Sequence, residues 1–254
     1  ENITVMSPLA AKAVDDLVFW MGVEDFYVYD GRVQKLPCAV KSYIFNDINL
    51  FQKEKIFAAL NSSFNEIWWF YPSEDSDTND RYVIYNHVEQ AWSYGTMARS
   101  AWLDRGILDN PIAAGLDNYL YNHEYGLDDG STSPASAITS YVESSQLDIG
   151  DGDKFVFIRR LVPDVTFDGS TTTTPSAAFT VKTRNFPGGD YLESNASTVT
   201  QSAAATTTTV EQFTDQVHIR LRGRAFALRV GSTDTEVQWR LGSPRVDIRE
   251  DGRR

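Results

Sequence analysis

Cysteine is almost absent from this chain: Cys38 is the only one among 254 residues. A single cysteine excludes an intrachain disulfide and gives no sign of an oxidising compartment. Cys38 stands in the apolar stretch LPCAV, where the nearest basic residues are Lys35 and Lys41. Because a reactive thiolate needs positive charge close by, this setting predicts a buried structural thiol.

Long apolar runs are absent too. None approaches the roughly 18 to 20 residues that a helix needs to cross a bilayer, so we expect no membrane span. The first residues, Glu1-Asn2-Ile3, lack the basic and then apolar pattern of a signal peptide and do not begin with Met. Since they already resemble part of a strand, we expect a longer parent protein with sequence upstream.

Catalytic motifs are a third absence. The sequence contains no nucleophile elbow, no phosphate-cradling glycine loop and no His-Glu-x-x-His helix. The glycine pair in NFPGGDY (185–191) is explained by a tight turn after proline. Acids are numerous enough for the two carboxylates of a glycosidase, but the sequence singles out no pair. We therefore predict no enzyme and no cofactor, and assign no catalytic, cofactor-binding or metal-binding residue.

Histidine is scarce, and two of the three histidines lie in a repeated Tyr-Asn-His, within YVIYNHVEQAW (82–92) and YLYNHEYG (119–126). His87 and His123, with Glu89 and Glu124, are ligand types that zinc or non-haem iron takes. They lack the spacing of ligands on one element, however, and a third ligand is unspecified. Asn after a strand is ordinary turn chemistry, so we predict repeated turns and not a metal site.

Positive charge is scarce except at one end. The chain has 23 Lys and Arg against 35 Asp and Glu, a formal charge of −12. Residues 217–254 hold nine Arg and five acids, a net of +4, so the remainder carries −16. An acidic body disfavours contact with DNA phosphates. The arginines either bind phosphate or pair with the acidic body, and the second is the simpler interpretation. They are Arg220, Arg222, Arg224, Arg229, Arg240, Arg245, Arg249, Arg253 and Arg254.

Aromatic residues, by contrast, make up 13% of the chain and occur in short runs beside Gly, Asn and Asp. This composition is typical of many short strands and predicts an all-β fold. The segments 17–22 and 26–31 form one expected hairpin, and 66–72, 81–86 and 91–95 form the next strand group.

An aromatic strand that ends in an Asp or Asn turn occurs three times: YVYDG, YVIYNH and YLYNHE. The spacings of 55 and 37 residues lie near the roughly 40 to 50 residues of a four-stranded propeller blade. We therefore expect propeller-like blades of antiparallel strands in residues 1–145. Residues 146–254 are expected to add further β elements, with threonine-rich loops and an arginine-rich hairpin.

Between the expected strands, 45–65 is predicted to hold at most one helical turn before a strand at 55–61. The acidic stretch SEDSDTND (73–80) lacks the ligand spacing of a calcium hand and is expected to be a hairpin tip. The threonine-rich segments 169–178 and 194–212 avoid helix and fit either loops or edge strands.

The last block, 216–230 and 236–250, is predicted to be one hairpin with period-two alternation. In its first arm Val217, Ile219 and Leu221 share one face, whereas His218 lies on the opposite, polar face with Arg220 and Arg222. His218 is accordingly expected to be exposed or interfacial.

Three segments together carry a resemblance to a known family: VFWMGVEDFYVYDGRVQKLPC, FNEIWWFYPSEDSDTNDRYVIYNHVEQAWSYGTMARSAW and RGRAFALRVGSTDTEVQWRLGSPRVDIREDGRR. They resemble the tail nozzle and packaged-DNA stabilisation proteins of short-tailed bacteriophages, from about 17 to 104 and from about 147 to 254. The resemblance implies a β-propeller with additional β elements. It also implies a hexameric ring at the distal end of the connector, around the channel by which DNA leaves. The closing segment resembles the family's last strand, so Arg254 is the expected C-terminus.

The function implied is that of a non-enzymatic structural protein of the virion, in the phage tail, which mediates DNA retention and ejection. Its expected partners are its own copies in a hexameric ring, the connector or adaptor and other tail proteins. Genomic DNA would pass without sequence-specific binding along an acidic wall, while arginines of the terminal hairpin make contacts with other subunits or with the connector.

Two alternatives remain open. One is a carbohydrate- or receptor-binding β-propeller module that stacks sugars on its aromatic side chains. The other is a glycosidase on a propeller. The aromatics concerned are Trp68, Trp69, Tyr71, Trp92 and Trp102.

Overall fold

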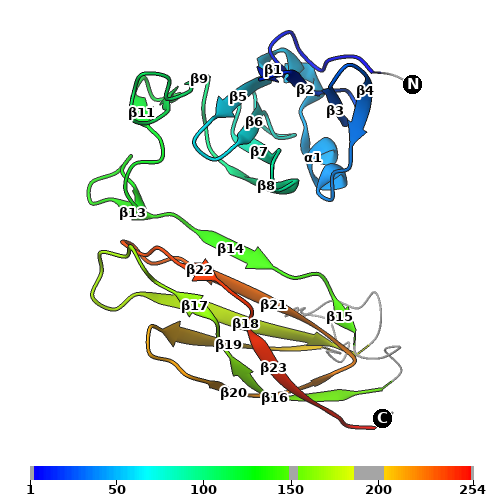
Figure 1. Cartoon of the computed structure of the whole chain (residues 1–254), viewed down its shortest axis with the longest axis vertical. Coiled ribbons are helices and arrows are strands. Elements are labelled where there is room, and N and C mark those ends of the chain that lie inside the picture. The colour runs from blue at the N-terminus through cyan, green and yellow to red at the C-terminus, as the bar shows by residue number, and fades with distance from the viewer. Residues whose placement is uncertain (1–2, 149–153, 186–202, 253–254) are drawn as a thin grey trace. The chain divides into compact units, whose positions relative to one another are not determined.

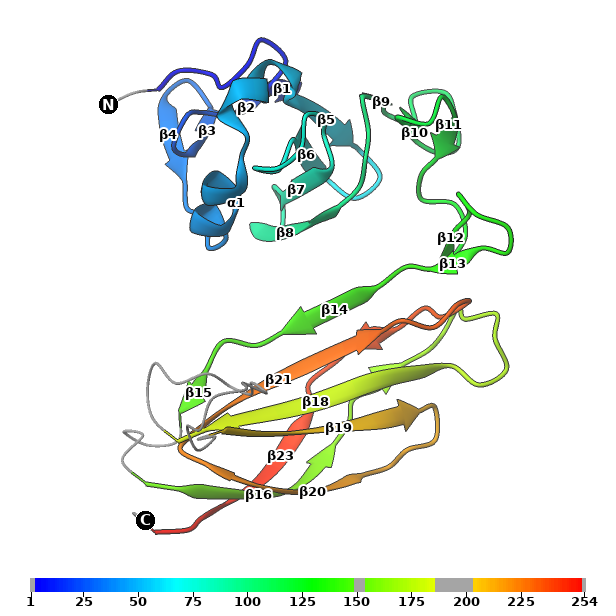
Figure 2. The same ribbon diagram turned by 180° about the vertical axis from the view of Figure 1, so that it is seen from behind.

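The computed structural model describes residues 3–148, 154–185 and 203–252, and it is predominantly β (Figures 1 and 2). The all-β prediction is thus confirmed. Two compact units divide the chain, Glu1–Tyr125 and Gly126–Arg254. The sequence places the division after residue 145. The structure places it earlier, because β14 (Ser140–Glu143) pairs along its whole length with β21 (Ala225–Ser232).

The first unit opens with two four-stranded antiparallel sheets, each in chain order. The first sheet includes the predicted hairpin at 17–31, and the second the predicted strands at 66–72, 81–86 and 91–95. Their strands are β1 (Ala11–Val14), β2 (Leu17–Met21), β3 (Phe26–Tyr29), β4 (Val33–Leu36), β5 (Phe57–Asn61), β6 (Glu66–Tyr71), β7 (Arg81–Asn86) and β8 (Ala91–Thr96).

The two sheets share an aromatic core. Phe26 of the first sheet lies with its ring centroid 4.9 Å from that of Trp69 in the second. Trp69 is fully buried, and its indole Nε1 donates to the carbonyl oxygen of Ala10 at 3.0 Å. Apolar burial and a satisfied indole N–H therefore both hold the sheets face to face.

Two short helices connect these sheets, where the sequence predicts at most one turn. They are α1 (Lys41–Asp47) and the 3-10 helix η1 (Leu50–Lys55). That prediction is wrong, whereas the strand expected after it, β5, is confirmed. Helix α1 buries Ile44 completely in the shared core. Two turns are too short to show a helical period, and tertiary packing stabilises them instead.

A three-stranded antiparallel sheet follows, with β10 (Ile112–Ala114) between β9 (Ala101–Leu103) and β11 (Leu120–Asn122). Trp102 of β9 stacks on Trp68 of the second sheet with centroids 5.2 Å apart. Both faces of β6 are therefore covered, which explains why five of its six residues are buried in succession.

The second unit is a β-sandwich (Figure 2). A five-stranded sheet and a three-stranded sheet enclose a largely aliphatic core. The five-stranded sheet contains β14, β15 (Leu147–Asp148), β18 (Ser176–Arg184), β19 (Ala203–Glu211) and β21. The three-stranded sheet contains β16 (Val156–Val162), β20 (Val217–Gly223) and β23 (Arg245–Glu250). Two small strand pairs are β12 (Asp128–Asp129) with β13 (Ser136–Ala137), and β17 (Val165–Thr166) with β22 (Arg240–Leu241).

The predicted terminal hairpin is wrong in its pairing. Its first arm breaks at Gly223, so that β20 and β21 lie in opposite sheets, and β23 pairs with β16 instead. A Cβ at Gly223 would meet the Cβ of Thr183 at 2.7 Å, so only glycine fits at this corner. The alternation within β20 is confirmed: Val217, Ile219 and Leu221 are buried.

The threonine-rich segments have different outcomes. Residues 169–175 form a loop and turn before β18, whereas 203–211 form β19 at one end of the five-stranded sheet. Residues 194–202 lie outside the described ranges. Among the helices of the described ranges, none is long and apolar enough to cross a membrane.

Candidate functional site

The repeated Tyr-Asn-His is brought to two different sheets. In the first copy, the Asn86 side chain accepts hydrogen bonds from the backbone N–H groups of Val88 and Glu89, at 3.1 and 2.9 Å. This is an Asx turn, as predicted for the first copy. The ring of His87 lies 5.9 Å from that of Phe19, and Glu89 is exposed.

The histidine of the second copy, His123, contacts Trp102 and Arg99. The ring centroid of Trp102 lies 4.6 Å from that of His123. Arg99 Nε donates a hydrogen bond to His123 Nε2 at 3.0 Å. Burial, followed by the nearby Arg99 charge, lowers the pKa of His123 to about 4. At neutral pH the imidazole is therefore uncharged, and its Nε2, which could otherwise ligate a metal, accepts a hydrogen bond from Arg99. Across the described residues, no group of three or more His, Cys, Asp or Glu is arranged to hold a metal ion.

A carboxylate pair that the sequence did not single out lies between the second and third sheets. Asn61 ends β5 and faces Glu66 across the β5–β6 register, while Glu124 follows β11. The Asn61 Nδ2 donates to Glu124 Oε1 at 3.0 Å and to Glu66 Oε2 at 3.4 Å. Trp68 Nε1 also donates to Glu66 Oε2, at 2.9 Å. One amide thus joins two acids that lie far apart in sequence.

Both acids are harder to ionise than usual. Burial raises the pKa of Glu66, and the adjacent Glu124 charge raises it further. Burial likewise raises the pKa of Glu124, although its bond to Asn61 opposes the shift. Glu124 also has a left-handed backbone, with φ of 56°. Raised carboxyl pKa values suit acid chemistry, but the pair lies against a packed aromatic cluster, in which the buried Trp68 stacks on Tyr82 and on Trp102.

The aromatic side chains considered for sugar stacking are core residues. Trp68, Trp69 and Tyr71 are buried, and Trp92 and Trp102 are partly buried against the same cores. Cys38 is partly buried, and desolvation raises the pKa of its thiol to about 11. Both outcomes favour structural roles for these side chains.

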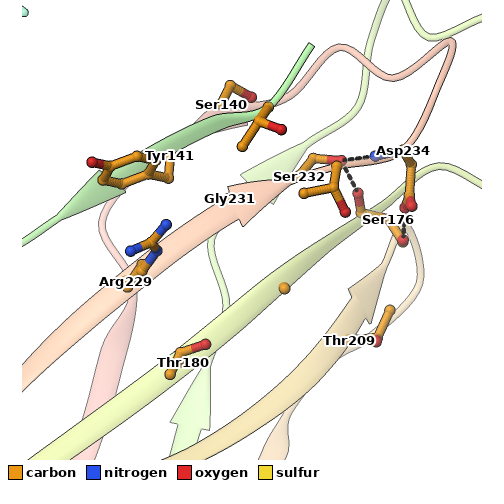
Figure 3. Close-up of a pocket in the computed structure, with 12 residues that line it drawn as sticks. Ser140, Tyr141, Ser176, Thr180, Thr209, Arg229, Gly231, Ser232 and Asp234 are labelled. Carbon is orange, nitrogen blue, oxygen red and sulfur yellow. Dashed lines mark hydrogen bonds between the residues drawn. The ribbon is translucent and has the colours of Figure 1, made fainter. Parts of the chain in front are cut away.

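The outer face of the five-stranded sheet carries a pocket of about 320 Å³ (Figure 3). Tyr141 and Arg229 lie at one end, with the guanidinium carbon 3.8 Å from the ring centroid. Asp234 lies at the other end and accepts from Ser176 Oγ at 2.7 Å. The remaining lining is mostly hydroxyl-bearing: Thr139, Ser140, Thr180, Thr209, Ser232 and Thr233, with Ala178 and Gly231.

Sequence reasoning did not find this pocket, because its residues come from four strands whose order in the sheet differs from their order in the chain. A shallow surface with hydroxyl groups, one cation and one carboxylate matches a polyhydroxylated ligand better than a polyphosphate. The sequence matches no protein-family model and no curated protein. The residues themselves therefore carry the functional argument.

Proposed function

We propose that this chain is a structural protein of a short-tailed bacteriophage tail, a nozzle that builds a hexameric ring around the DNA exit channel below the connector. The observation that carries this proposal is the pair of consecutive four-stranded antiparallel sheets packed through one aromatic core. Four-stranded antiparallel sheets in succession are the repeating unit of β-propellers. In this proposal the two sheets are blades, and the three-stranded sheet begins another.

The outer side of the β9–β11 sheet in the first unit supports this interpretation. Leu103 and Leu120, which the register places on the same face, are 62 and 75% exposed. Apolar side chains gathered on one small sheet favour a covering partner. In a propeller the next blade provides such a cover, and in a ring a neighbouring copy does.

The charge of the first unit supports a channel role. It contains 18 acids and 9 basic residues, and thus carries −9. A wall of this sign repels DNA phosphates, so the polymer passes without sequence-specific binding. The partners proposed are other copies, the connector or adaptor, and further tail proteins in the virion.

Native mass spectrometry and electron microscopy test this proposal together. The expected result is a sixfold ring. A chain that stays monomeric at every concentration would contradict the proposed function. A lumen lined by positive potential would contradict the acidic-wall part alone.

A carbohydrate-binding module is the second candidate. The observation that favours it is the hydroxyl-lined pocket with Tyr141, Arg229 and Asp234 on the sandwich (Figure 3), and not the propeller-like region. Binding on a glycan array that is lost with Tyr141→Ala and Asp234→Ala would favour this candidate. Its matched control is Tyr43→Ala, which removes an exposed tyrosine of the first unit.

A further inference from the structure

In the second unit, the outer face of the three-stranded sheet formed by β16, β20 and β23 is rich in arginine. In β20 the exposed residues alternate with the buried ones, and β23 presents its exposed arginines on the same side of the sheet. Register places Arg222 and Arg249 on either side of Phe157 in the central strand. We call these residues the arginine face: Arg159, Arg160, Arg220, Arg222, Arg245 and Arg249.

Only part of this charge is neutralised locally. Arg222 pairs with Asp251, and Arg160 lies 3.8 Å from Asp247. The other four arginines of the face are exposed and form no ion pair with any residue that the structure describes: Arg159, Arg220, Arg245 and Arg249. Four unneutralised guanidinium groups on one small sheet favour a negatively charged partner.

An acidic loop lies on the first unit between β6 and β7, with Lys55 Nζ bound to the backbone carbonyl of Asp77. Glu74, Asp75 and Asp77 are exposed there. The loop is tied to η1, because Asn49 Nδ2 donates to the Ser76 carbonyl at 2.9 Å and Gln52 Nε2 donates to Asp77 at 3.2 Å. The loop is therefore held in place before any partner binds.

Phe51 lies on η1, the helix to which the acidic loop is tied, and adds an apolar anchor. Its side chain is 99% exposed, although a phenylalanine gains most from burial. Interfaces commonly combine one buried aromatic anchor with a charged rim. We call Phe51, Glu74, Asp75 and Asp77 the acidic patch.

We propose that the arginine face of one copy binds the acidic patch of the next copy. The proposal rests on the proposed ring. In the proposed ring each copy offers its arginine face to one neighbour and its acidic patch to the other, so the contact is head-to-tail, and repeated head-to-tail contacts close into a ring or extend into a filament. The opposite charges at this contact attract neighbouring copies, and the head-to-tail arrangement makes every copy point the same way around the ring axis.

A second copy fits the arginine face better than DNA does. The chain as a whole carries −12, so a phosphate backbone that approaches the face also meets the long-range repulsion of the rest of the chain. A neighbouring copy instead offers a local cluster of carboxylates and an exposed aromatic ring. Carboxylate and guanidinium also match in planar, bidentate geometry.

Two full-length charge-reversal variants test the contact. The first is Arg220→Glu with Arg249→Glu, and the second is Glu74→Lys with Asp75→Lys. Each variant alone opposes like charges at every contact, so we expect each to lose the oligomer by native mass spectrometry. Mixed in equal amounts, they restore opposite charges at every contact of an alternating even-numbered ring. We therefore expect the mixture to recover the wild-type number of subunits, with the two variants in equal numbers.

Control variants reverse one charge of each sign elsewhere on the surface. Arg240→Glu lies outside the arginine face, and Asp109→Lys lies outside the acidic patch, both at exposed positions. These controls should keep the oligomer. Circular dichroism should show the β content of all variants unchanged, and Phe51→Ser should weaken assembly without a change of charge.

Each other outcome overturns the inference in a recognisable way. If the reversed variants still assemble as wild type does, the contact is wrong while the proposed ring stands. If each loses the oligomer and the mixture stays dissociated, the charges do not meet between copies. If the arginine variant loses binding to duplex DNA at low salt but keeps the oligomer, the face binds nucleic acid instead. A monomeric wild type contradicts both the inference and the proposed function.

Discussion

The two units stabilise their β-sheets in different ways. The first unit contains five of the six tryptophans and joins its sheets through indole hydrogen bonds. Trp69 donates to Ala10, Trp92 to Pro37 and Trp102 to Leu60, each linking segments far apart in the chain. The second unit has a core of Val, Ile, Leu and Phe, built by strand alternation. The first unit therefore depends on a few large side chains, whereas the second distributes its stability along two sheets.

The largest expected effect comes from removing one of those large side chains. Trp69→Ala deletes a fully buried indole and its hydrogen bond to Ala10, and should lower the free energy of unfolding of the first unit by about 3–5 kcal/mol. Hydrogen exchange read by mass spectrometry should show lost protection in 3–125 and unchanged protection in 154–252. Equal loss in both units would contradict their independence.

In the second unit, the corresponding test adds a side chain where the structure has no space for one. Gly223→Ala places a Cβ 2.7 Å from that of Thr183 at the corner between the two sheets, and should cost the second unit about 1–3 kcal/mol. Urea denaturation with exchange as the readout measures this cost. Gly130→Ala is the control, because a Cβ there meets nothing within 4 Å. Equal effects of the two substitutions would refute the steric reason given for Gly223.

The same contrast explains what could be predicted from the sequence. Strands in the first unit were predictable because several short aromatic runs end at an Asn, Asp or Gly turn, as in Phe26–Tyr29 and Arg81–Asn86. Strand partners in the second unit were not. Residues 216–222 alternate with a period of two, but 225–228 are four consecutive apolar residues, so alternation does not show which strand each arm pairs with. The close approach of Gly223 to Thr183 accounts for the corner at which the chain changes sheets.

The candidate sites follow the same logic. The Asn61–Glu66 contact was within reach of sequence reasoning, because strands at 55–61 and 66–72 joined by a short turn place these residues opposite each other. Glu124 was not, since it arrives from a third sheet. The arginine face was half predictable: the exposed side of β20 follows from alternation, whereas its neighbour β23 depends on a pairing that alternation does not specify.

A smaller expected effect is a dependence of the first unit's stability on pH, caused by His123. The pKa of His123 is lowered to about 4 in the folded first unit, whereas an unfolded histidine titrates near about 6.5. The unfolded chain therefore binds a proton first, so this contribution to stability is full above about pH 6.5 and is lost as pH falls toward 4. Urea midpoints of the first unit should fall over that range in the wild type, and less in His123→Gln. The same slope in both proteins would contradict this origin.

The smallest expected effect comes from Glu124, next to His123, and its contribution to stability changes with pH in the opposite direction. Burial raises the pKa of Glu124 in the folded first unit, so its favourable contribution is present below the unfolded pKa near about 4.3 and is lost as pH rises through the folded value. Glu124→Gln keeps an oxygen that can accept from Asn61 and removes the repulsion on Glu66. We expect it to stabilise the first unit at pH 7 by no more than about 1 kcal/mol, and to be neutral near pH 4. Carboxyl NMR should show the pKa of Glu66 move down toward its ordinary value. A variant that is less stable at pH 7 would mean that the Glu124 charge helps to hold the third sheet against the second.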